Sequence, residues 1–187
     1  MFRIEDLIKN SDCAHGDKYH IFFGRQEYAE YLTPHEDVAL ISIGSVPDIG
    51  CRGDDWHRTC RDKWKDHYFL RLEFIDLCPE SAMAHHKVFL ENYSKDVDKD
   101  EEDFEKWYSR QVFFSEEMAD QIIDFLQNMP ENIRLIFVNC EAGVSRSAAV
   151  AKWIGEKFDI PVNTCNYYNK HVYRVLSERY KIRSLIL

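Results

Sequence analysis

The segment IRLIFVNCEAGVSRSAAVAKWI, residues 133–154, constrains the fold more than any other part of the chain. An apolar run with strand character, residues 133–139, leads into Cys140, and the small, periodic residues at 146–158 predict a helix. The residues between them, 141–145, are mostly small and predict a tight turn. A buried strand that passes directly into a helix is a building unit of α/β proteins.

The rest of the chain alternates strands and helices in the same way. The predicted strands are 18–25, 37–44 and 67–77, and the predicted helices are 26–32, 79–93, 115–129 and about 164–180. Ser115 is expected to cap the third helix and Asn163 the last, which would bury Val172, Val175 and Leu176. The alternation predicts an α/β fold with a central, mostly parallel sheet flanked by helices on both faces. Cys140 would lie at the carboxyl end of a strand, where such sheets bind ligands.

Length and charge limit the classes of function. The 187 residues predict one domain, 1–187, and a net charge of −9 argues against a nucleic-acid partner. No apolar stretch reaches membrane-spanning length, and MFRIEDLIKN lacks the apolar core of a signal peptide, so we expect a cytoplasmic protein with no membrane partner. The six cysteines are therefore expected to be thiols.

The spacing of Cys140 and Arg146 carries little information by itself, because a cysteine at a strand end is usually a packing residue. The surrounding residues are more informative. Gly143 can adopt a positive φ, so backbone N–H groups of the turn can converge on an anion, and a helix beginning at Arg146 directs further N–H groups to the same point. Arg146 adds a permanently charged fork for phosphate oxygens. The phosphate-binding residues are thus predicted to be Glu141, Ala142, Gly143, Val144, Ser145 and Arg146.

A cradle for a dianion also stabilises a thiolate, so we expect Cys140 to be nucleophilic at neutral pH. A thiolate, a phosphate cradle and an arginine clamp together indicate phosphoryl transfer through a covalent cysteinyl-phosphate.

The sequence CEAGVSRS, residues 140–147, resembles the signature loop of the cysteine-based protein tyrosine phosphatases. It is most similar to their compact, dual-specificity-like branch, of the kind found in bacteria and phages. YFLRLEFIDL resembles the strand that leads to the loop carrying the general acid, and NYYNKHVYRVL the late helix behind the site. The resemblance implies a tyrosine-phosphatase-like fold, with the phosphate-binding loop between a central strand and a helix.

The resemblance also implies a role for each matching residue. Cys140 would attack phosphorus, Arg146 would bind the phosphoryl oxygens, and Ser147 would help the thiolate leave when the intermediate is hydrolysed. Asp76 matches the general acid, and Asp48 is a weaker candidate. This chemistry requires no metal and no cofactor.

Two features depart from the family pattern. Asn139 stands where the family usually has histidine. An amide is still able to hydrogen-bond the loop backbone, but it carries no charge, so we expect it to stabilise the thiolate less than histidine does. Asp76 also lies 64 positions before Cys140, further than in compact members. An acidic insertion at about 93–112 would account for the excess, and its run at 96–105 holds seven carboxylates and one lysine, in a solvated loop or at the start of an exposed helix.

The sequence favours a phosphatase for phosphorylated proteins that acts on phosphotyrosine, with phosphoserine and phosphothreonine left open as further substrates. A phosphatase for phospholipids, nucleotides or RNA ends is a second hypothesis, although residues 141–145 contain no lysine for a highly charged inositol phosphate. A catalytically weak module that binds phosphorylated partners is a third, supported by Asn139. The oligomeric state is not predicted.

Other motifs are interpreted as non-functional. DVDKDEEDFEKW, residues 96–107, begins like a calcium loop but lacks the required glycine and the terminal glutamate. The cysteines and histidines near residues 13–20 and 51–67 lack the paired spacing of zinc sites.

Overall fold

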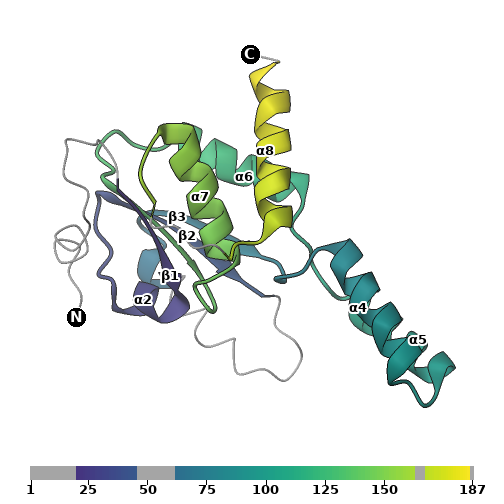
Figure 1. Ribbon diagram of the computed structural model, residues 1–187. Helices are drawn as coiled ribbons and strands as arrows, with labels where there is room; N and C mark the ends of the chain where they lie inside the picture. The colour runs from purple at the N-terminus through teal and green to yellow at the C-terminus, as the bar shows by residue number, and fades with distance from the viewer. Residues whose placement is uncertain (1–19, 46–61, 163–166, 186–187) are drawn as a thin grey trace.

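The computed structural model describes residues 20–45, 62–162 and 167–185. In these residues, four strands form one parallel sheet in the order β1-β4-β2-β3 (Figure 1). The strands are β1 (His20–Arg25), β2 (Val38–Gly44), β3 (Tyr68–Glu73) and β4 (Leu135–Cys140). The predicted parallel α/β sheet is confirmed. Asp48, most of the cysteines and histidines near residues 13–20 and 51–67, and Asn163 lie outside the described residues.

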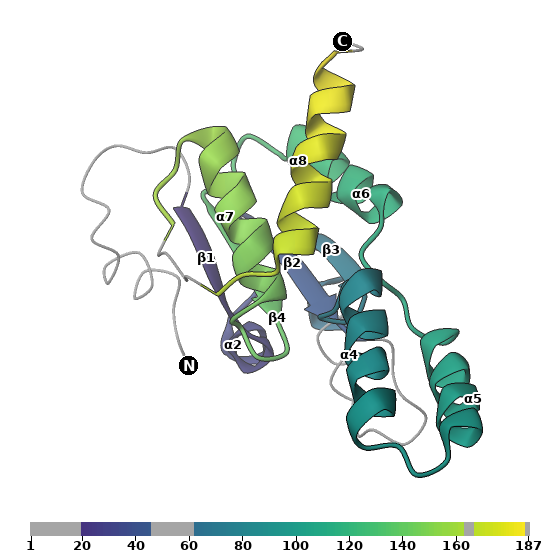
Figure 2. The ribbon, with the colours of Figure 1, turned by 45° about the vertical axis from the view of Figure 1, so that its right-hand side comes forward.

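Helices cover both faces of the sheet (Figure 2). They are α2 (Gln26–Tyr31), α4 (Pro79–Asn92), α5 (Val97–Tyr108), α6 (Glu116–Gln127), α7 (Arg146–Phe158) and α8 (Lys170–Ser184). Helices α6, α7 and α8 pack together on one face, and the short α2 lies on the other. No helix in the described ranges has both the length and the apolar character needed to span a bilayer.

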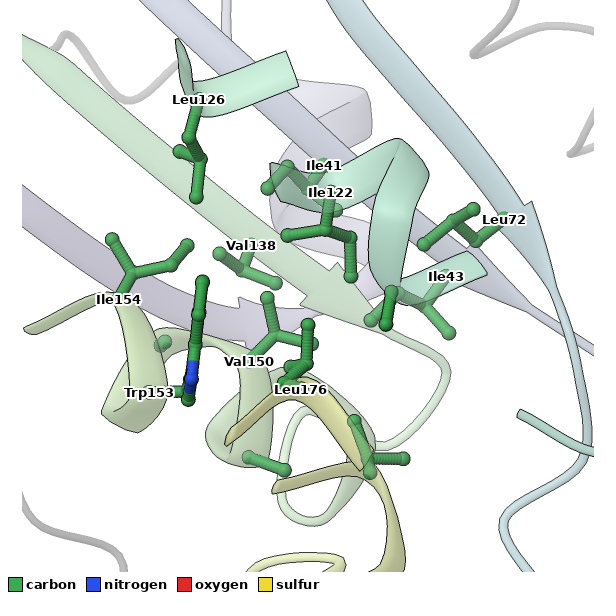
Figure 3. Packing of buried hydrophobic residues seen from close by; sticks show 14 of the residues in the cluster. Ile41, Ile43, Leu72, Ile122, Leu126, Val138, Val150, Trp153, Ile154 and Leu176 are labelled. Atoms are coloured by element: carbon green, nitrogen blue, oxygen red, sulfur yellow. The ribbon is translucent and has the colours of Figure 1, made fainter. Parts of the chain in front are cut away.

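The two faces of β4 have separate cores. Ile136, Val138 and Cys140 alternate with Leu135 and Phe137, and all five are buried. The first set packs under α6, α7 and α8, where the side chains from strands and helices interdigitate (Figure 3). The second set packs against residues of α2 and against a fully buried tryptophan, Trp64. Burial on both sides explains why β2 and β4 are apolar on both faces, apart from the buried polar residues Ser42 and Asn139.

Two predicted boundaries are wrong. The strand expected at 67–77 ends at Glu73. Its neighbour in the described part of the sheet, β2, ends at Gly44, and the Gly44 carbonyl accepts the last hydrogen bond between the two strands from Phe74 N at 2.9 Å. The last helix begins at Lys170 instead of 164, because Asn169 provides its side-chain cap, accepting a hydrogen bond from Val172 N at 3.1 Å. Burial of Val172, Val175 and Leu176 is confirmed.

The acidic run lies in helix α5 and not in a loop. Asp96 caps this helix by accepting a hydrogen bond from Lys99 N, and the residues after it continue as regular helix to Tyr108. A helix cannot wrap its carboxylates around calcium as a binding loop does, so rejection of the calcium motif agrees with the structure. Together α4 and α5 form a helical hairpin that projects from the sheet (Figures 1 and 2).

Helices α6 and α8 are joined by a charged cluster. The Asp120 carboxylate accepts hydrogen bonds from Arg179 at 2.8–3.0 Å and forms a second ion pair with Arg183. The hydrogen bonds from Arg179, followed by the positive charges of Arg179 and Arg183, lower the pKa of Asp120.

We expect Asp120→Asn to destabilise the protein by about 1–2 kcal/mol at neutral pH, because charge-assisted hydrogen bonds are lost. A lowered pKa means that the stabilisation is present above the pKa of the unfolded carboxyl and is lost as pH falls through the folded value. Urea unfolding should therefore separate the variant from the native protein at pH 7, and the difference in unfolding free energy should shrink progressively as pH falls below about 4. If the difference in unfolding free energy between the two proteins stayed constant over this pH range, the stabilisation would not come from the ionised Asp120 carboxylate.

Candidate active site

Three strands end at the same edge of the sheet and bring the predicted residues together there. Cys140 is the last residue of β4 and pairs in register with Ile43 of β2 and with Arg25 of β1. Ser45 follows β2, and Asp76 follows β3. Because all strands are parallel, residues that follow them meet at one edge.

The turn after Cys140 depends on Gly143. Its φ is +68°, which confirms the expected positive value. A Cβ at this position would lie 2.3 Å from the backbone N of Arg25 and 2.4 Å from the carbonyl carbon of Gly24. Glycine is therefore required at position 143 for two reasons, its backbone conformation and the close approach of the turn to the end of β1.

Helix α7 begins at this turn without a side-chain cap. Ser145 occupies the N-cap position, but its hydroxyl donates a hydrogen bond to Asp76 Oδ1 at 2.8 Å and caps nothing. By contrast, the side chains of Cys78, Asp96, Ser115 and Asn169 cap α4, α5, α6 and α8. The first N–H groups of α7 thus carry partial positive charge with no side-chain acceptor among the described residues, an arrangement that suits an anion.

Cys140 and Ser147 are in direct contact. Their Sγ and Oγ atoms lie 3.1 Å apart, and both side chains are buried, Cys140 with 1% of its surface exposed. The serine hydroxyl can donate a hydrogen bond to a thiolate, which stabilises the charged form.

Arg146 is buried and is fixed by one side of its guanidinium. Nη1 donates to Phe74 O at 2.6 Å and to Ser45 Oγ at 3.1 Å, so the side chain is tied to the residues that follow β3 and β2. Nη2 lies 3.4 Å from a carboxylate oxygen of Glu141, whose side chain is mostly exposed. Nε is buried and has no acceptor in the described part of the chain. One edge of the guanidinium is thus an anchor, and the Nε–Nη2 edge retains donors for two anion oxygens.

Asp76 is held against the turn by two hydrogen bonds. Its Oδ1 accepts from Ser145 Oγ and from Asn169 Nδ2, each at 2.8 Å. Asn169 also donates its backbone N–H to Ser145 O at 3.2 Å while its side chain caps α8. Asn169 therefore connects Asp76, the turn at 141–145 and helix α8. Asn169 was not predicted, because the cap was assigned to Asn163, although an Asn directly before an apolar helical pattern was the available signal.

Asn139 makes no side-chain hydrogen bond to the loop backbone among the described residues. Its side chain is fully buried on the opposite face of β4 from Cys140, and neither Nδ2 nor Oδ1 has a partner among the described residues. Its neighbours across the sheet are Gly24 and Ser42, and Ser42 Oγ accepts from Arg71 at 2.9 Å. Asn139 is a residue beneath the site and not part of the loop.

A second group of polar side chains lies beside Asp76. Cys78, Glu80 and His171 each offer a potential metal-ligand atom within 4.8 Å of the others. Each is already engaged: Cys78 with Ser81, His171 with Phe114 O and the Arg174 guanidinium, and Glu80 with hydrogen bonds from its own backbone N–H and from Cys78 that lower its pKa. The arginine beside His171 would oppose a cation, so we assign no metal to this group.

Comparisons with known proteins add little information about the function. No protein-family model matches the chain, and no curated protein matches it. Among solved structures, PTPMT1 is similar over 90% of this chain and 94% of its own, with 12% sequence identity and a TM-score of 0.41. A likeness this distant says nothing about the chemistry of the site, so the function is inferred from the positions and contacts of the side chains.

Proposed function

We propose that the protein is a cysteine-dependent phosphatase that hydrolyses phosphotyrosine in protein substrates through a cysteinyl-phosphate intermediate. The proposal rests mainly on the burial and the hydrogen bonding of the Arg146 guanidinium. A buried guanidinium anchored through Nη1, with Nε lacking an acceptor among the described residues, is what a clamp for phosphoryl oxygens requires. Cys140 and the uncapped N-terminus of α7 lie at the same turn.

The chemistry follows from these positions. The Cys140 thiolate attacks phosphorus, forming a sulfur–phosphorus bond as the bond to the ester oxygen breaks, and Asp76 gives a proton to the departing oxygen. Water then attacks the cysteinyl-phosphate, Asp76 accepts the proton of that water, and Ser147 stabilises the departing thiolate by a hydrogen bond. Backbone N–H groups of residues 141–146 and the Arg146 guanidinium bind the phosphoryl oxygens throughout.

The hydrogen bonds of Asp76 support its role as the acid. Ser145 and Asn169 both donate to Oδ1, so the proton for the leaving group belongs on Oδ2. These bonds also hold the carboxyl group next to the turn that would bind the phosphoryl group. A positioned acid contributes about 10²–10⁴-fold to such reactions.

A protein substrate is favoured over a highly charged small molecule by the charge of the turn. Residues 141–145 contribute no lysine, and Glu141 places a carboxylate 3.4 Å from Arg146 Nη2. A second candidate, a phosphate-binding module with little turnover, is favoured by Asn139, which is uncharged and makes no hydrogen bond to the loop among the described residues.

The test compares the native protein and Asp76→Asn on aryl phosphates whose leaving groups differ in acidity. The native protein should hydrolyse all of them between about pH 5 and 8, and trapped enzyme should carry phosphate on Cys140. Asp76→Asn should lose about 10²–10³-fold in kcat on poor leaving groups and much less on para-nitrophenyl phosphate, which needs little protonation. Equal losses on both classes would remove Asp76 from the role of acid. Phosphate binding without turnover by the native protein would establish the binding module instead.

A further inference from the structure

The hairpin of α4 and α5, residues 79–108, is built differently from the rest of the fold. Its first residue, Pro79, lies three positions after Asp76, and both helices extend away from the sheet (Figures 1 and 2). Of their residues, Ala82 in α4 is buried and none in α5 is. Neither helix therefore contributes more than a single side chain to the cores of the sheet.

The hairpin nevertheless has its own internal order. His86 of α4 stacks on Phe104 of α5 with ring centroids 3.8 Å apart and an interplanar angle of 4°. Trp107 and Tyr108 pack against Phe104, and Ser94 Oγ donates to Asp100 at 2.7 Å to fix the connection between the helices. A surface held in one conformation in this way loses little entropy on binding a partner.

Helix α4 exposes apolar side chains that the hairpin does not cover. Met83, Val88, Phe89 and Tyr93 are 59%, 53%, 43% and 72% exposed, and the rings of Phe89 and Tyr93 stack on one another. Single exposed apolar residues are ordinary, but Met83, Phe89 and Tyr93 lie within about 120° of one another around the helix and its C-cap, whereas Val88 lies on another face. These three side chains form a group of the kind found at interaction sites.

Helix α5 adds a strong negative charge beside this apolar surface. The run at 96–105 holds seven carboxylates and one lysine, and Asp98, Glu101 and Glu105 are exposed. Such a surface repels anionic membranes and nucleic acids and attracts lysine- and arginine-rich segments.

We propose that the hairpin is a docking surface for a segment of the phosphoprotein substrate that combines basic and apolar residues. The basic residues would face α5, and the apolar ones would contact the exposed side chains of α4. This inference rests on the proposed phosphatase function and defines its substrate class more narrowly. A 14-residue helix is about 20 Å long, a distance that roughly six extended residues span, so the docking segment should lie about five to ten residues from the phosphotyrosine.

The experiment uses two phosphotyrosine peptides that share the residues next to the phosphotyrosine. In one, the distal segment contains Lys, Arg and Leu, and in the other it contains Glu and Leu. The native protein should hydrolyse the basic peptide with a kcat/KM at least about tenfold higher, mainly through KM, and the preference should shrink as salt screens the charges.

Variants locate the effect on the hairpin. Asp98→Asn, Glu101→Gln and Glu105→Gln combined should abolish most of the preference while leaving hydrolysis of para-nitrophenyl phosphate unchanged. Glu36→Gln, Glu131→Gln and Asp159→Asn combined is the matched control, since these exposed acids lie on the sheet body and should keep the preference. Met83→Ser with Tyr93→Ser should weaken binding of the basic peptide independently of salt.

The outcomes separate the two proposals. If the native protein hydrolyses para-nitrophenyl phosphate but treats both peptides alike, or if the α5 variant keeps the preference, the docking surface is wrong and the phosphatase function stands. If neither the aryl phosphate nor either peptide is hydrolysed, the phosphatase function itself is wrong.

Discussion

Cys140→Ser is expected to lower kcat for para-nitrophenyl phosphate by at least about 10⁴-fold, with little change in the folded structure. Serine differs from cysteine by one atom, and the buried site beside Ser147 Oγ accepts a hydroxyl without a change in volume that would disturb the core. A hydroxyl, however, stays protonated at neutral pH, so it supplies no anion to attack phosphorus. Steady-state kinetics together with thermal unfolding would measure both quantities.

The matched control is Cys78→Ser. Cys78 caps α4 by accepting a hydrogen bond from Ser81 N, a function that a serine hydroxyl also performs, and no step of the mechanism uses its thiol. This variant should keep native turnover. Cys140→Ser should still bind inorganic phosphate, seen as a rise in unfolding temperature, since the turn and Arg146 remain. Residual turnover in Cys140→Ser close to the native level would contradict a cysteinyl-phosphate mechanism.

The part of the site that the sequence predicted is the part built from contiguous residues. In residues 140–147, a strand end, a glycine with positive φ and a helix start succeed one another, and local conformational rules suffice to place Cys140, Gly143 and Arg146 at one turn. The parallel sheet was predictable for a similar reason, because alternating strands and helices admit few arrangements.

The contacts between distant segments were not predictable in this way. Arg146 Nη1 binds Phe74 O, 72 positions away, and Asn169 Nδ2 binds Asp76, 93 positions away. Whether two distant residues meet depends on the order of the strands in the sheet. That order, in which β2 lies between β4 and β3, does not follow from the order of the strands along the chain. The pairing of α4 with α5 was not predicted for another reason. The carboxylates of 96–105 were compatible with a solvated loop and with the start of an exposed helix, and no local pattern indicates that Phe104 stacks on His86.

Arg146→Lys is expected to lower kcat/KM by about 10²–10³-fold, even though the positive charge is kept. In the proposed mechanism the guanidinium performs two tasks at once. Nη1 binds Phe74 O and Ser45 Oγ, while Nε, which has no acceptor among the described residues, and Nη2, which contacts only the exposed Glu141 carboxylate at 3.4 Å, would bind phosphoryl oxygens. A lysine ammonium is a single point charge. If it binds the strand-end oxygens it cannot also present a fork to the phosphoryl group, and if it reaches the phosphoryl group those oxygens lose their donor.

The two tasks of Arg146 can be separated by measuring stability beside kinetics. Ser45→Ala removes one anchor and leaves the fork, so it should lower kcat/KM by less than about tenfold, whereas Arg146→Lys should lower both kcat/KM and the unfolding temperature. Arg174→Lys is the control for replacing an arginine by a lysine. Arg174 is half exposed and pairs with Glu178, so this variant should leave turnover unchanged. If Arg146→Lys kept native turnover while losing stability, the guanidinium would be a structural bridge between strand ends, and the phosphoryl clamp would have to be sought in the backbone of the turn alone.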